Sequence, residues 1–105
     1  MFSLFGKMEF DSVNARDLGE NHGINLVDVR ERYEYEAGHV PSARNIPMGE
    51  IITEPEKYLN KDNEYHVICH SGSRSSRTCS RLSSLGYKVV NVNGGTMSYG
   101  QPLNR

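Results

Sequence analysis

The central segment of the chain, residues 65–85, reads YHVICHSGSRSSRTCSRLSSL. Its first five residues are apolar and β-branched at the centre, which predicts a strand covered on both faces. A short polar loop containing Gly72 follows the strand. Residues 73–85 then have the composition of a helix, which we expect Gly86 to end. A strand, a glycine-bearing loop and a helix in this order indicate an α/β domain with a parallel sheet.

Two more apolar runs predict further strands, INLVDV at residues 24–29 and YKVVNV at residues 87–92. Helices are predicted between the strands. Asp11 or Ser12 can cap one through about residue 20, with Val13 and Leu18 on its inner side. A capping box, TEPE at residues 53–56, predicts a short helix to residue 59. The length of 105 residues fits one domain, 1–105, with no second core.

Asp28 and Cys69 end two of these strands, so a parallel sheet brings them to the same edge. After Cys69, Gly72 and short serines allow successive N–H groups to turn inward as an anion-binding nest. The start of the helix adds the positive end of its dipole. A thiol in this cup is predicted to ionise readily, and Arg74 is expected to face the thiolate or an incoming anion. The structural alternative is a cysteine buried as a small apolar residue.

The loop CHSGSRS at residues 69–75 resembles the active-site loop of the rhodanese family. The stretches LVDVRE (26–31), GHVPSA (38–43) and NIP (45–47) resemble that family's amino-terminal signature, and LGY (85–87) and VNGG (92–95) its carboxy-terminal one. The resemblance covers nearly the whole chain in the right order. It implies a three-layer rhodanese domain, with a central, mostly parallel sheet of about five strands and helices on both faces.

The activity implied by this resemblance is that of a thiosulfate sulfurtransferase-like enzyme. A sulfane sulfur passes from a donor such as thiosulfate to a thiophilic acceptor through a persulfide on Cys69, the catalytic nucleophile. The substrate-binding loop comprises His70, Ser71, Gly72, Ser73 and Arg74. Two alternatives stay open, a non-catalytic binding module and a phosphatase or arsenate reductase. Modules without turnover typically lack the cysteine, and related phosphatases place arginine six positions after it, whereas Arg74 follows Cys69 by five.

For several residues outside the loop, the sequence is compatible with either a functional or a structural role. Asp28 can brace the loop or Arg74 from the neighbouring strand, or cap the next helix. Arg30 can support the site in the same way, or form a surface ion pair. His39 is expected to make structural hydrogen bonds in a turn. Cys79 lies opposite the stripe of arginines on its helix, so we expect it in the core rather than acting as a resolving thiol.

Two positions depart from the family pattern. Ser42 stands where glycine is usual, which affects a turn. Tyr99 stands where tryptophan is common, and it can still provide a flat apolar cover.

Composition sets the expected surroundings of the protein. A hydrophobic share of 36% and a mean hydropathy of −0.62 suit a globular chain and exclude a membrane span. The first seven residues lack the apolar run of a secretory signal, so we expect the cytoplasm and two free thiols. The histidines show no metal-ligand spacing, and no cofactor is expected.

Charge points to the expected partners. Residues 65–105 contain five cations and no carboxylate, whereas all thirteen carboxylates precede them. This asymmetry favours a small anionic sulfur donor, thiosulfate or a persulfide, although ordinary surface charge explains it as well. The expected acceptor is a thiol, for instance of a thioredoxin-like protein. A nucleic-acid partner would need a denser basic stripe, and we expect a monomer.

Overall fold

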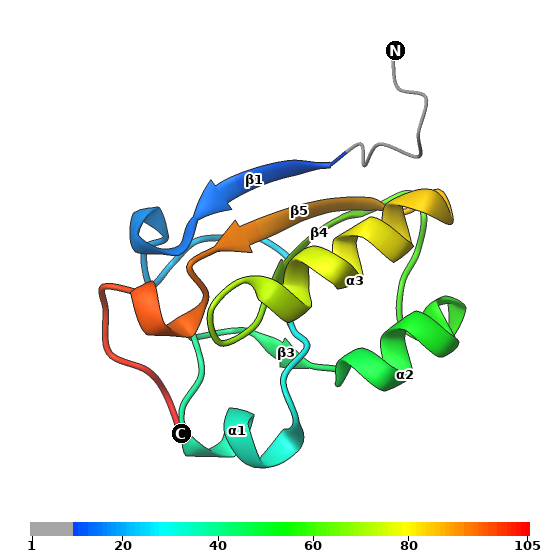
Figure 1. The fold of residues 1–105 in the computed structure, drawn as a ribbon. Helices are drawn as coiled ribbons and strands as arrows, with labels where there is room; N and C mark the ends of the chain where they lie inside the picture. The colour runs from blue at the N-terminus through cyan, green and yellow to red at the C-terminus, as the bar shows by residue number, and fades with distance from the viewer. Residues whose placement is uncertain (1–9) are drawn as a thin grey trace.

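A computed structural model describes residues 10–105 and contains a five-stranded sheet in which every strand pair is parallel (Figure 1). The strand order is β1-β5-β4-β2-β3. The strands are β1 (Asp11–Asn14), β2 (Leu26–Asp28), β3 (Arg44–Asn45), β4 (Glu64–Ile68) and β5 (Lys88–Asn93). The expected α/β class with about five parallel strands is therefore confirmed. The first seven residues, in which no secretory signal is predicted, lie outside the described part of the chain.

Within residues 10–105, three α-helices and two 3-10 turns connect these strands, and a third 3-10 turn follows β5. They are α1 (Arg32–Ala37), α2 (Met48–Thr53), α3 (Ser73–Ser84), η1 (Ala15–Asp17), η2 (Pro55–Lys57) and η3 (Thr96–Ser98). Helices α2 and α3 pack together beside the sheet (Figure 1). Within residues 10–105, no helix has the length and apolar content needed to cross a bilayer.

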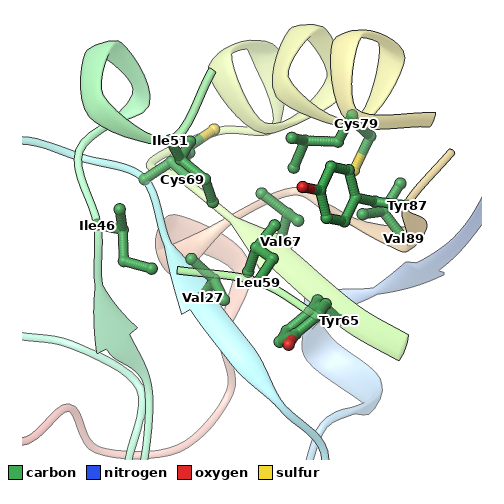
Figure 2. Packing of buried hydrophobic residues seen from close by; sticks show 12 residues of the cluster. Val27, Ile46, Ile51, Leu59, Tyr65, Val67, Cys69, Cys79, Tyr87 and Val89 are labelled. Atoms are coloured by element: carbon green, nitrogen blue, oxygen red, sulfur yellow. The ribbon is translucent and has the colours of Figure 1, made fainter. Parts of the chain in front are cut away.

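The core is divided between the two faces of the sheet because successive strand residues point to opposite sides. On the face under α2 and α3, Val27, Val67 and Val89 join Leu82 of α3 in one apolar cluster (Figure 2). On the other face, a second cluster is built from strand, η1 and loop residues: Ala15, Leu26, Val40, Ala43, Ile68, Val92 and Tyr99. Both faces are thus covered, as the near-continuous apolar runs predict.

The three predicted buried strands and the long helix are confirmed. Residues 24–29 contain β2, residues 65–69 contain most of β4, and residues 87–92 contain most of β5. Helix α3 begins at Ser73 as predicted and ends at Ser84, with Leu85 as its C-cap. Gly86 follows with a φ of 96°, the left-handed backbone that stops the helix.

The helix predicted over residues 11–20 is wrong. Asp11–Asn14 instead forms the edge strand β1, paired in parallel with β5, and only a single 3-10 turn follows at Ala15–Asp17. The edge of β5 offers N–H and C=O groups that a four-residue strand can satisfy, and this tertiary pairing outweighs a weak local helix preference. Val13 and Leu18 do pack against the second cluster.

The capping box predicted at residues 53–56 does not form. Thr53 is the last residue of α2, and its hydroxyl donates to the Gly49 carbonyl oxygen at 2.6 Å. With that hydroxyl occupied inside the preceding helix, Glu54 becomes the cap residue without a side-chain hydrogen bond. Pro55–Lys57 makes one 3-10 turn in place of the expected short helix.

Candidate active site

The loop after β4 lies at the carboxyl edge of the sheet, where β4 runs beside β2. The two strands pair with Asp28 opposite Ile68, and the Val29 N–H donates to the Ile68 carbonyl oxygen at 3.0 Å. Cys69 follows Ile68 directly, so Asp28 and Cys69 do end their strands at the same edge. Parallel strands thereby deliver a carboxylate and a thiol to one region of the molecule.

The Cys69 thiol lies inside a cup of hydrogen-bond donors. Cys69 is 1% exposed, and its Sγ accepts hydrogen bonds from the Gly72 N–H at 3.1 Å and the Ser75 N–H at 3.3 Å. The neutral thiol donates to the Ser75 hydroxyl oxygen at 3.4 Å, and once the thiol is ionised the hydroxyl can turn its proton toward Sγ. Burial raises the pKa of Cys69, but hydrogen bonds from the Ser75 hydroxyl and three loop N–H groups outweigh it, so the pKa lies below its usual value.

Ser75 contacts the Cys69 sulfur, although it lies outside the substrate-binding residues 70–74 predicted from the sequence. It sits in the first turn of α3, fully buried, where its N–H donates to the sulfur and its hydroxyl oxygen accepts from the neutral thiol. With the thiol neutral, the hydroxyl donates its own proton to the Gly72 carbonyl oxygen at 3.2 Å. A serine in the first turn of a helix that follows a cysteine loop was the available signal.

The base of the loop is held by the chain after β5. The N–H groups of Thr96 and Met97 donate to the carbonyl oxygens of Cys69 and His70 at 2.9 and 3.1 Å. Gly95 makes this approach possible, because a Cβ there would lie 2.3 Å from the His70 carbonyl oxygen. The backbone of the loop is therefore fixed on its inner side, while the side chains of His70, Ser71 and Ser73 are exposed.

The Arg74 side chain, expected to face the thiolate or an incoming anion, is paired with a carboxylate. Its guanidinium forms two hydrogen bonds to the Glu34 carboxylate of α1, Nη1 to Oε1 at 2.7 Å and Nη2 to Oε2 at 2.9 Å. The hydrogen bond from Arg74 is the main cause that lowers the pKa of Glu34 to about 2. The loop and α1 are thus clamped together, and the sequence reasoning missed Glu34 because it did not predict α1.

Asp28 and Arg30 form a buried ion pair with each other. The Arg30 Nη2 donates to Asp28 Oδ2 at 2.8 Å and to the Gly38 carbonyl oxygen at 2.8 Å, and its backbone N–H donates to Asp28 Oδ1 at 3.0 Å. The Asp28 carboxylate makes its side-chain hydrogen bonds to Arg30 rather than to Arg74, so a bracing role toward the loop stays a prediction. The pair instead fixes the segments around α1.

The remaining candidates have structural positions. The His39 Nδ1–H donates to the Tyr35 carbonyl oxygen at 2.9 Å and the ring stacks on that of Tyr35, in agreement with the predicted structural role. Cys79 is fully buried in the core, as predicted, and Figure 2 shows its sulfur directed toward Tyr87. Burial and the nearby Cys69 raise the pKa of Cys79 to about 12. Tyr99 is nearly buried and joins the second cluster, as expected of an apolar cover.

Comparisons with known proteins agree on the family of this fold. The sequence model of the protein family described as "Rhodanese-like domain" matches residues 13–101 of this chain. A Bacillus subtilis protein with the name "Putative sulfurtransferase YtwF" is 42% identical over 88% of this chain and 92% of its own length. A protein named "Sulfurtransferase" from Allochromatium vinosum is 30% identical, over 91% of this chain and 89% of its own. The crystal structure of a rhodanese-related protein from Thermoplasma volcanium superposes with a TM-score of 0.80 at 39% identity, covering 90% of this chain and 98% of that one.

Proposed function

The chain belongs to the rhodanese-like domain family, and from this membership we propose that it is a sulfurtransferase in which Cys69 carries the transferred sulfur as a persulfide. The observation that supports the proposal is the set of donors around Sγ: two backbone N–H groups within 3.3 Å and a hydroxyl at 3.4 Å. These groups stabilise negative charge on sulfur, which both the attacking thiolate and the persulfide carry.

In the proposed first step, the Cys69 thiolate attacks the outer sulfur of the donor. A new S–S bond forms on Sγ, and the S–S bond of the donor breaks. The leaving group takes the electron pair, departing as sulfite from thiosulfate or as a thiolate from an organic persulfide. The terminal sulfur on Cys69 then carries one negative charge, for which Gly72, Ser75 and the start of α3 offer donors.

In the second step, an acceptor thiolate attacks the terminal sulfur of the Cys69 persulfide. The Sγ–S bond breaks, the acceptor leaves as a persulfide, and the Cys69 thiolate is regenerated without an external reductant. Because the pKa of Cys69 is lowered from its usual value by hydrogen bonds to the sulfur, its thiolate is a better leaving group in this step. We propose a small anionic sulfur donor and a thiol acceptor, such as a thioredoxin-like protein, in the reducing cytoplasm, where the two free cysteines stay unpaired.

Sulfur transfer to cyanide, measured beside hydrolysis of an aryl phosphate, tests this function against its rivals. We expect transfer without phosphatase activity, and a loss of at least ~10³ in rate for Cys69→Ala, because the remaining loop has no nucleophile. Transfer that survives in Cys69→Ala would exclude the persulfide mechanism. Phosphate hydrolysis alone would identify a phosphatase, and no turnover in either assay would identify a binding module.

A further inference from the structure

The arginine of the loop is electrically neutralised by its partner. Both oxygens of Glu34 accept from the Arg74 guanidinium, and Oε1 also accepts the Glu31 N–H at 2.9 Å. Glu34 is held in this orientation by the capping box of α1. Because its pKa is lowered to about 2, chiefly by the bond from Arg74, the carboxylate stays ionised at every working pH. The pair therefore carries no net charge.

Three other arginines do not supply the charge that Glu34 cancels. Arg30, which precedes α1, is paired with Asp28 inside the protein. Arg77 and Arg81 of α3 line a separate groove of about 600 Å³ with Phe10 and Ser76. Among residues 10–105, the sulfur is consequently faced by N–H and hydroxyl dipoles and a helix terminus, with the one arginine of the loop compensated.

The neutral Glu34–Arg74 pair affects the binding of a sulfur donor to an extent that depends on the charge of the donor. Thiosulfate has two negative charges in neutral solution, whereas an organic persulfide ion RSS⁻ has one. The repulsion of each donor by the Glu34 carboxylate scales with its charge, and so does the attraction that Arg74 would exert if it were unpaired. Backbone dipoles suffice for a single charge on sulfur, while a dianion gains most from a free guanidinium.

We propose that Glu34 is a positioning residue that selects the donor: by pairing with Arg74 it favours a monoanionic organic persulfide over dianionic thiosulfate. This inference rests on the proposed sulfur transfer through Cys69. It names the class of donor for the same site and follows from the Glu34–Arg74 geometry.

A charge series at this pair tests the inference. We would measure kcat/KM for thiosulfate and for the persulfide of 2-mercaptoethanol, prepared in situ, with cyanide as the common acceptor. The variants are E34Q, R74Q and the double variant E34Q/R74Q, beside wild type. The ratio of the two kcat/KM values is the readout, because a reduced folded fraction or a displaced loop lowers both rates and cancels in the ratio.

We expect the thiosulfate-to-persulfide ratio to follow the net charge of the pair. E34Q, with a free guanidinium, should raise it about five- to tenfold, and this gain should shrink as salt rises above ~0.1 M. R74Q should lower the ratio, and the double variant should return it toward wild type. The matched control is E36Q, which removes an exposed carboxylate of the same helix and should leave the ratio unchanged.

A ratio that stays constant across the series would overturn the donor selection and leave Glu34 as a structural clamp. That outcome differs from a failure of the proposed function. If wild type accepted sulfur from neither donor, or if Cys69→Ala retained transfer, the persulfide mechanism and the inference resting on it would both fall.

Discussion

Replacing Gly95 by alanine should both destabilise the protein and disturb the reactive loop. The new Cβ would lie 2.3 Å from the His70 carbonyl oxygen, 2.4 Å from the Cys69 carbonyl oxygen and 2.4 Å from the His70 carbonyl carbon. All three are backbone atoms at the end of a buried strand, so no flexible side chain can move aside. The loop or the turn at η3 must shift instead.

Two contributions set the size of the effect. Gly95 has φ 61° and ψ −162°, a region that is essentially confined to glycine and costs about 1–3 kcal/mol for other residues. Overpacking against a rigid neighbour adds about 1–3 kcal/mol. We therefore expect a loss of roughly 2–6 kcal/mol in the free energy of unfolding, a large share of the 5–15 kcal/mol typical of a domain.

Urea unfolding measures the loss, and the rate of Cys69 alkylation by iodoacetamide reports the loop. The shift would strain the bonds from Thr96 and Met97 to the loop carbonyls, so the reactivity of the thiol should change as well. Gly49→Ala is the matched control, because its Cβ would meet no atom within 4 Å. A Gly95→Ala protein within about 0.5 kcal/mol of wild type and with unchanged alkylation would refute the close approach described here.

Three further predictions follow from the site and the core. Ser75→Ala removes the hydroxyl that can donate to the ionised Sγ, so the pKa of Cys69 should rise and alkylation at neutral pH should slow. Ser76→Ala is the control and should leave the alkylation rate unchanged. Equal rates in Ser75→Ala and wild type would show that the hydroxyl does not stabilise the thiolate. Cys79→Ser should retain sulfur transfer but lower stability in urea by about 1–3 kcal/mol through a poorly paired buried hydroxyl. A ready Cys69–Cys79 disulfide under mild peroxide would instead make Cys79 a resolving thiol. The folded pKa of Glu34, about 2, lies below its ordinary 4.5, so its contribution to stability is complete above pH 4.5 and fades toward pH 2. The melting temperatures of wild type and E34Q should accordingly converge over that range, and a constant difference would contradict the ion pair.

The central sheet and the cysteine loop were predictable because their signals are local. Near-continuous apolar runs identified β2, β4 and β5, and the change from strand to glycine-bearing loop to helix located Cys69 at a strand end. Cys79 could be placed in the core from helical spacing alone, since α3 is long enough for its faces to be defined.

The two features that were not predicted, strand β1 and the partner of Arg74, depend on residues that are distant in the sequence. Edge strand β1 exists because β5 lies beside it, some 80 residues later in sequence. The partner of Arg74 is Glu34, and α1 escaped prediction because its cap residue is Glu31 rather than serine, threonine, aspartate or asparagine. Neither pairing leaves a trace in local periodicity.

The structure shows the backbone conformation at Ser42, one of the two positions that depart from the family pattern. Ser42, at the place of the usual glycine, has a φ of 68°. The turn therefore keeps the left-handed backbone that glycine would adopt without cost, and the serine bears the strain.

Intact mass after incubation with a sulfane-sulfur donor tests the persulfide on Cys69 most directly. Wild type and Cys79→Ser should each gain the mass of one sulfur atom, and the addition should disappear on treatment with cyanide or a thiol. Cys69→Ala should gain none. Sulfur loaded onto Cys69→Ala, or a wild-type protein that stays unmodified with both thiosulfate and an organic persulfide, would contradict the role assigned to Cys69.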